Sequence, residues 1–198
     1  MKWQNKRSSE DDETSECGDN ENVRTVGNNI YFYDDVTTES ILELTVQIKK
    51  LTTELSRKAV DTPGYEPYID IHINSGGGDV FSGLAGMDTI YNNDIWINTY
   101  VDGMCASAAT FLLLGGHYRY MNRHSYVLIH QLTSGYWGKY EEMKDDMVNN
   151  ERIMKTIINL YKKYTNVPEQ RLGIFMKKDI YIDANKCLRY QIVDEISA

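Results

Sequence analysis

The chain has 198 residues, 41% of them hydrophobic, which is enough for one domain with a sizeable core. Its formal net charge is −8 and its pI is about 5.0, and no stripe of basic residues interrupts the acidic pattern. A nucleic-acid partner is not expected, because binding to phosphates needs clustered cations.

Neither a membrane segment nor a secretory leader is expected. The longest uncharged apolar stretch, around Phe111 to Gly116, is too short to span a bilayer, and no apolar run stands near the N-terminus. Cys17, Cys105 and Cys187 form no CxxC pair, so neither a disulfide framework nor a zinc site is indicated. We expect a cytoplasmic protein that needs no metal or other cofactor.

Residues 1–22 differ in composition from the rest of the chain. They contain three basic and seven acidic side chains, a net charge of −4, and almost no aliphatic side chain. Such a segment cannot bury enough apolar surface to fold. We expect an acidic, disordered tail over residues 1–22 and one folded domain over residues 23–198.

Apolar spacing predicts the first elements of the domain. Ile30 to Tyr33 is a short strand candidate, and hydroxyl side chains with an early acid at residues 37–40 are typical of a helix start. Apolar residues then recur every three or four positions, at Ile41, Leu44, Ile48, Leu51 and Leu55. They predict an amphipathic helix that ends at the proline-containing loop 61–67.

Two strand-helix units follow. Ile69, Ile71 and Ile73 alternate with polar residues, a glycine loop occupies residues 74–79, and helical spacing resumes at Val80. Residues 95–101 alternate again and lead into a second apolar segment of helical length. Successive units of this kind predict a parallel sheet with right-handed crossovers.

Shorter elements and one long helix complete the chain. Strand candidates at 118–121 and 126–129 suggest a hairpin, and later candidates are a helix after Pro168, a strand at 180–182, a helix capped by Asp183 and a strand at 192–196. A long helix is predicted from about Gly138 to Tyr164, with an apolar stripe. So small a domain cannot bury the whole stripe, so part of it is expected to meet another subunit.

Ser107 is the candidate nucleophile. It is the one hydroxyl in the middle of a run of small residues between a predicted strand and an apolar helix. Unpaired N–H groups and the positive end of the helix dipole favour an oxygen that acquires negative charge there. A serine at this place is also explained as a helix cap beside tightly packed small residues.

Histidines and glycines supply the remaining candidates. His130 follows an apolar strand, where loops of an α/β domain assemble sites, and it can act as a base near pH 7. His72, His117 and His124 are most simply structural or exposed. The glycines at 76–78 can present N–H groups to an anion, although a tight turn explains them equally well. The residues alone do not select a carboxylate to orient the histidine.

Four blocks resemble the proteolytic subunits of the Clp protease, the ClpP family, over roughly residues 23–197. The blocks are Ile73-Asn74-Ser75-Gly76-Gly77-Gly78, Gly103-Met104-Cys105-Ala106-Ser107-Ala108, Ile129-His130-Gln131, and Asp179-Ile180-Tyr181-Ile182-Asp183-Ala184 followed by Tyr190-Gln191-Ile192-Val193-Asp194. Each block is weak alone, but four in the same order are specific.

The resemblance implies an α/β fold of the crotonase-like, ClpP type, with repeated β-β-α units and a protruding handle helix. It also implies an ATP-independent serine endopeptidase whose triad is Ser107, His130 and Asp179, with Gly77 and Ala108 N–H groups in the oxyanion hole. Substrates would be peptides or unfolded proteins. The subunit would form a homo-oligomeric ring, a heptamer or double ring, served by an AAA+ unfoldase such as ClpX, ClpA or ClpC.

Departures from the family pattern keep alternatives open. Gly76 replaces a usual proline, Gln191 replaces a usual glycine, and the tail does not resemble the family's axial loop. A catalytically silent ring subunit that modulates an active homologue is therefore the alternative. Binding of an acyl thioester, as in other crotonase-like proteins, is a third interpretation, and His124 is the alternative base.

Overall fold

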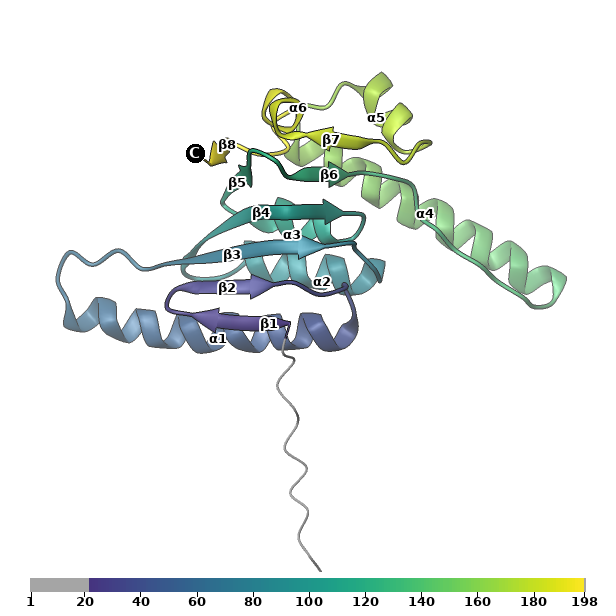
Figure 1. The fold of residues 1–198 in the computed structure, drawn as a ribbon. Coiled ribbons are helices and arrows are strands. Elements are labelled where there is room, and N and C mark those ends of the chain that lie inside the picture. Colours follow the sequence, from purple (N-terminus) through teal and green to yellow (C-terminus); the bar gives the residue numbers. More distant parts are fainter. Residues whose placement is uncertain (1–21, 198) are drawn as a thin grey trace, which may run out of the picture.

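A computed structural model describes residues 22–197 of the chain (Figure 1). Apart from Asn22, the acidic tail expected over residues 1–22 lies outside the described residues. The strands are β1 (Val23–Val26), β2 (Asn29–Phe32), β3 (Tyr68–Ser75), β4 (Trp96–Ala106), β5 (Tyr118–Asn122), β6 (Tyr126–Leu128), β7 (Tyr181–Asp183) and β8 (Glu195–Ser197). The helices are α1 (Thr38–Asp61), α2 (Val80–Tyr91), α3 (Ala109–Gly115), α4 (Tyr140–Tyr164), α5 (Glu169–Phe175) and α6 (Ala184–Arg189).

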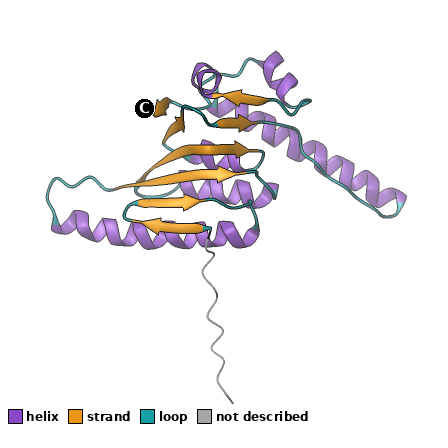
Figure 2. Cartoon of the chain, in the orientation of Figure 1, coloured by secondary structure: helices purple, strands orange, loops and turns teal. Residues whose placement is uncertain are grey.

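The predicted parallel sheet is confirmed. Its main path runs β1-β2-β3-β4-β5-β8, and every pair along it is parallel except β1 with β2. Helices α1, α2 and α3 lie on one side of this sheet, and the other side is open in the described part of the chain (Figures 1 and 2). The apolar core lies between the sheet and these three helices.

The apolar periodicities identified the core correctly. All five apolar residues on the predicted face of α1 are buried, and Thr37 caps the helix in a reciprocal pair of hydrogen bonds with Ser40. Ile69, Ile71 and Ile73 of β3 are fully buried on the side that faces the helices. Burial of their aliphatic side chains stabilises the packing of helix against sheet.

The predicted hairpin at residues 118–129 is wrong. Both β5 and β6 pair with β4 in parallel, but at different positions along it: β5 pairs with Asn98–Val101 and β6 with Met104–Ala106. The sequence also underestimated β4, which continues past Val101 to Ala106, and missed β1. The small residues of the nucleophile block therefore belong to a strand, because two neighbouring strands supply hydrogen bonds to its edges.

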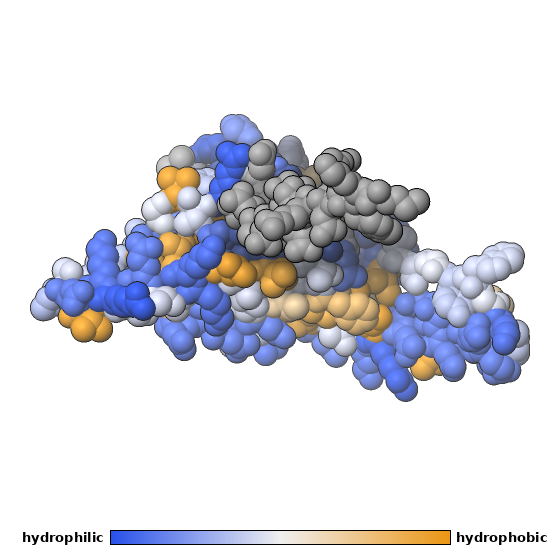
Figure 3. All heavy atoms as spheres, turned by 90° about the horizontal axis from the view of Figure 1, so that it is seen from below, coloured by the Kyte–Doolittle hydropathy of each residue, from blue (hydrophilic) through white to orange (hydrophobic). Residues whose placement is uncertain are grey.

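Helix α4 is long, as predicted, and projects from the body as an arm (Figure 1). Only Ile157 and Tyr161, near its C-terminal end, are buried. Apolar side chains on its N-terminal half are exposed, and apolar groups stand among hydrophilic ones on this arm (Figure 3). They are Tyr140 (68% exposed), Met143 (45%), Met147 (65%) and Val148 (47%). Over residues 22–197, no helix is long and apolar enough to cross a bilayer.

An ion pair ties the C-terminal segment to the sheet. The Arg119 guanidinium donates to both carboxylate oxygens of Asp194, from Nε at 3.0 Å and Nη2 at 2.8 Å, and its Nη1 donates to the Tyr164 carbonyl at 2.7 Å. The Arg119 side chain is 13% exposed. Gln191, nearby in sequence, has φ of 50°, so the usual glycine at this position is replaced at the cost of local strain.

Replacing Arg119 with alanine is expected to lower the free energy of unfolding by about 3 kcal/mol, because it leaves Asp194 largely buried without its cation. Urea denaturation followed by circular dichroism measures the change. Lys144→Ala, which removes the exposed pair with Glu141, is the matched control and should change stability little. Equal effects of the two substitutions would contradict a structural role for the Arg119 pair.

Candidate active site

Ser107 stands at the junction of β4 and α3 in a strained conformation. Its φ is 54°, a left-handed value that costs a residue with a side chain about 1–3 kcal/mol. The Ser107 N–H donates to the Leu128 carbonyl at 2.9 Å, which continues the pairing of β4 with β6 by one residue. The turn is thus fixed by the sheet, and the serine side chain is left half-buried at the sheet edge.

Strand register brings two of the three predicted catalytic residues, Ser107 and His130, to one edge. In the parallel pair of β4 and β6, Ala106 lies opposite Leu128, so Ser107 and His130 both follow the carboxyl ends of their strands. In the antiparallel pair of β6 and β7, Leu128 lies opposite Tyr181. Asp179 precedes β7 by two residues, and the register changes beyond Leu128, because the Gln131 N–H donates to the Met176 carbonyl.

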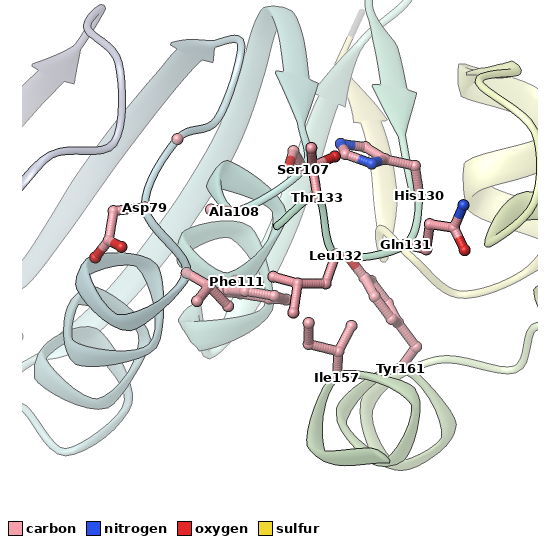
Figure 4. A pocket seen from close by; sticks show the side chains of 12 residues that line it. Asp79, Ser107, Ala108, Phe111, His130, Gln131, Leu132, Thr133, Ile157 and Tyr161 are labelled. Carbon is pink, nitrogen blue, oxygen red and sulfur yellow. The ribbon is translucent and has the colours of Figure 1, made fainter. Parts of the chain in front are cut away.

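Ser107 and His130 line one cavity of about 210 Å³ (Figure 4). The His130 ring points toward Ser107, and apolar side chains from α3, α4 and the segment after His130 form the opposite wall (Figure 4). The lining residues are Gly78, Asp79, Val80, Ser107, Ala108, Phe111, His130, Gln131, Leu132, Thr133, Ile157 and Tyr161. Tyr161 is buried and its hydroxyl lies 2.5 Å from Thr110 Oγ1, which satisfies both hydroxyl groups.

The three predicted catalytic residues are not joined by hydrogen bonds within residues 22–197. No bond links Ser107 Oγ to His130, or the His130 ring to Asp179, whose side chain is exposed. The alternative base, His124, is exposed in the turn before β6 and does not line the cavity. The geometry therefore favours His130 over His124 as the partner of Ser107.

The glycine loop packs directly against the nucleophile turn. Gly77 has φ of 95°, and a side-chain carbon there would come within 2.6 Å of both the Ala106 carbonyl oxygen and Ser107 Cβ. Its carbonyl accepts a 2.8 Å bond from Val36 N–H, and its own N–H donates to the buried Ser75 Oγ at 3.1 Å. Only glycine fits this approach.

The resemblance assigned Gly77 to the oxyanion hole, but it is Gly78 of the same loop that lines the cavity, and Gly77 does not. The Gly77 C=O and the Gly78 N–H belong to the same trans peptide, so they point in opposite directions. Because the Gly77 carbonyl accepts a hydrogen bond from the Val36 N–H, the Gly78 N–H points away from Val36. The Ala108 N–H belongs to the turn that opens α3, where amides lack partners within the helix. The family motif identified this loop, but the hydrogen bonds of the folded loop are needed to distinguish the roles of Gly77 and Gly78.

Other reactive groups near Ser107 are poorly suited to catalysis. Cys105 lies two residues before it and is fully buried, and this burial raises the pKa of its thiol well above the usual value. The neutral thiol is a weak nucleophile, so Cys105 fits a packing role. Among residues 22–197, no three His, Cys, Asp or Glu side chains are grouped so that they could hold a metal ion.

Comparisons with known proteins found relatives of similar sequence. ATP-dependent Clp protease proteolytic subunits of Chlorokybus atmophyticus and Deinococcus radiodurans are 34% and 27% identical to the chain, each over 69% of its length. The matched part spans 60% of the first relative and 68% of the second. A subunit of the same name from Pleurastrum terricola is 34% identical over 65% of the chain and 66% of its own length.

A solved structure of similar fold is a ClpP1 mutant from Listeria monocytogenes. The two superpose with a TM-score of 0.70, covering 83% of this chain and 88% of that one, at 22% identity. The family model of the Clp protease matches residues 27–198, which include the glycine loop and the segments of Ser107, His130 and Asp179. The chain therefore belongs to the Clp protease family.

Proposed function

We propose that the chain is a serine endopeptidase subunit in which Ser107, His130 and Asp179 act as a catalytic triad. The observation that carries the proposal is the register of β4 with β6, since Ser107 and His130 follow the carboxyl ends of these two paired strands. The shared cavity of Ser107 and His130 supports it. Membership of the Clp protease family supports it independently.

Each residue has a defined role in the proposed reaction. Ser107 Oγ attacks the peptide carbonyl while His130 accepts its proton and later returns it to the leaving amine. Asp179 orients the imidazole and stabilises it when charged. The oxyanion that forms on the carbonyl accepts hydrogen bonds from Ala108 N–H and from the glycine loop, through Gly77 as the sequence predicted or through Gly78.

The cavity suggests an apolar side chain next to the scissile bond. Its wall away from Ser107 includes Leu132, Ile157 and Phe111. We therefore propose peptides and unfolded proteins as substrates, cut after apolar residues. The relatives are named as subunits of an ATP-dependent protease, which supports an AAA+ unfoldase as the partner that supplies unfolded chains. Free, buried Cys105 and Cys187 are consistent with a reducing, cytoplasmic location.

The exposed stripe of α4 supports assembly into a ring or double ring of identical subunits. Apolar side chains on so exposed an arm need a partner surface. Ile157 and Tyr161 on the same helix line the cavity, so contacts along the arm would act on the wall of the site.

A catalytically silent, modulatory subunit is the second candidate. The exposed Asp179 and the bond from Gly77 N–H to Ser75 Oγ favour it, because both groups would have to move before they could act. Assembly could supply that movement, so activity must be compared in the isolated and assembled states.

The nucleophile is tested with a fluorophosphonate and a fluorogenic peptide that has an apolar residue before the scissile bond. We expect one adduct on Ser107 by mass spectrometry and a loss of about 10⁶-fold in turnover for Ser107→Ala. Asp179→Asn should lose about 10⁴-fold, since the imidazole would take the wrong tautomer. A fully active Ser107→Ala sample would exclude the triad.

His124→Ala is the control for the base. It should retain normal turnover, whereas His130→Ala should be inactive. Wild-type protein that is assembled but unlabelled would favour the silent subunit.

The glycine loop provides a matched pair of substitutions. Gly77→Ala is expected to destabilise the loop by about 2 kcal/mol or more and to reduce turnover, because its Cβ would overlap the backbone of Ala106 and Ser107. Gly76→Ala should change neither property strongly, because its nearest neighbours would be 3.9 Å away. Thermal unfolding and peptide turnover measure both variants, and similar behaviour of the two would contradict this packing.

The assembly proposal is tested on α4. Replacing Met143 and Met147 with aspartate should shift the assembled protein toward smaller species in sedimentation velocity, since charges would face a buried contact. Asn149→Asp, on the opposite side of the helix, should leave the distribution unchanged. An unaltered oligomer in the double variant would exclude the stripe as an interface.

A further inference from the structure

Tyr161 carries a buried hydroxyl group that has no part in the proposed reaction. Its side chain extends from α4 to the wall of the cavity, and the residue is 2% exposed (Figure 4). A phenol hydroxyl that has left water needs a hydrogen-bond partner, because an unsatisfied buried group is destabilising. The partner of Tyr161 is Thr110 of α3, which is also buried.

Tyr161, Thr110 and Ser107 form a continuous chain of hydrogen bonds. The Tyr161 hydroxyl oxygen lies 2.5 Å from Thr110 Oγ1, and Thr110 Oγ1 donates to the Ser107 carbonyl oxygen at 2.6 Å. A threonine hydroxyl has one hydrogen, and the bond to the carbonyl uses it, because a carbonyl can only accept. The Tyr161 hydroxyl is therefore the donor to Thr110.

Burial makes this chain of hydrogen bonds persistent. It raises the pKa of Tyr161 well above the usual value, so the hydroxyl remains a donor throughout the neutral pH range. Hydrogen bonds in series polarise one another where water is excluded. The Tyr161 hydroxyl thus acts on the Ser107 carbonyl through Thr110, although it does not touch Ser107.

The Ser107 carbonyl fixes the direction of the Ala108 N–H. Both groups belong to one trans peptide bond, so they point in opposite directions. The Thr110 N–H donates to the same carbonyl at 3.0 Å, so the backbone and the side chain of Thr110 both hold it. Ala108 lines the cavity, and its N–H makes no hydrogen bond within residues 22–197. Thr110 therefore keeps a free N–H, one of the proposed oxyanion donors, in a single orientation.

The other contacts of the nucleophile turn do not hold this carbonyl. The Ser107 N–H is bonded to Leu128 of β6, and Gly77 packs against Ser107 Cβ, but neither contact involves the Ser107 oxygen. Tyr161 is itself well anchored, because its carbonyl accepts hydrogen bonds from the N–H and Oγ1 of Thr165, at 3.0 and 2.6 Å. The turn is thus held on its carbonyl side from the fixed end of α4.

We propose that Tyr161 is a positioning residue for the oxyanion hole, which orients and polarises the Ala108 N–H through Thr110 and the Ser107 carbonyl. The inference rests on the proposed serine peptidase function. An N–H that is held in place stabilises charge as it develops on the substrate oxygen in the transition state, and it adds little to binding of the uncharged substrate. Loss of the Tyr161 hydroxyl should therefore lower kcat and leave KM unchanged.

Tyr161→Phe tests the inference, because it removes the hydroxyl and keeps the ring that lines the cavity. With the assembled full chain and the fluorogenic peptide, we expect kcat to fall about tenfold and KM to change less than about twofold. A peptide aldehyde, whose adduct with Ser107 carries the oxyanion, should lose affinity by the same factor as kcat.

Two substitutions at Thr110 test the middle of the chain of hydrogen bonds. Thr110→Val keeps the shape and removes the hydroxyl, and it should lower kcat about a hundredfold, close to the loss of one oxyanion donor. Thr110→Ser restores the hydroxyl and should recover most of the wild-type kcat. Tyr161→Phe combined with Thr110→Val should be no slower than Thr110→Val alone, because both groups act through one chain of bonds.

Thr99→Val is the matched control. Thr99 is fully buried, and its Oγ1 also donates to a carbonyl of α3, that of Leu113, at 2.9 Å, but it does not line the cavity. The variant should lower the thermal unfolding temperature as Thr110→Val does and keep the wild-type kcat. Sedimentation velocity on every variant ensures that proteins of equal assembly are compared.

The possible outcomes separate this inference from the proposed function. A wild-type kcat in Tyr161→Phe, a loss confined to KM, or an equal loss of kcat in Thr99→Val would overturn the positioning role and leave the triad in place. Assembled wild-type protein that neither cleaves the peptide nor reacts with the fluorophosphonate would instead overturn the proposed function, and the inference with it.

Discussion

The divided edge of β4 is the constraint on which the rest of the structure depends. One side of this strand pairs with β3 along most of its length, while the other pairs first with β5 and then with β6. Two parallel strands can share one edge only if the second begins where the first ends. That change of partner carries β6 beyond the main sheet, and with it β7, His130 and the approach to Asp179.

The same change of partner explains the strained serine. Because Ala106 and Ser107 continue the hydrogen bonds to β6, the chain must leave the strand within one residue to begin α3. A left-handed φ at Ser107 makes that turn, and the ladder on one side and the glycine loop on the other hold it. The strained backbone at Ser107 thus results from the pairing of β4 with β6. The same turn places the Ser107 hydroxyl at the mouth of the cavity.

Helix α4 presents two different surfaces along its length. The C-terminal end of α4 closes the cavity with Ile157 and Tyr161, while its N-terminal half is an exposed apolar arm. One helix therefore connects the wall of the cavity to an exposed apolar surface.

The sequence by itself determined the local elements and the chemical candidates. Helical spacing gave α1 and α4, alternation gave β3 and the start of β4, and the motif blocks gave Ser107, His130 and Asp179, because these signals depend on neighbouring residues only. Tertiary structure alone decided the partners of β5 and β6, the length of β4 and the place of Gly78 beside the cavity. Each of these depends on the register between strands that are far apart in the chain. Pairing between distant strands produces no periodic pattern in the sequence from which the register could be read.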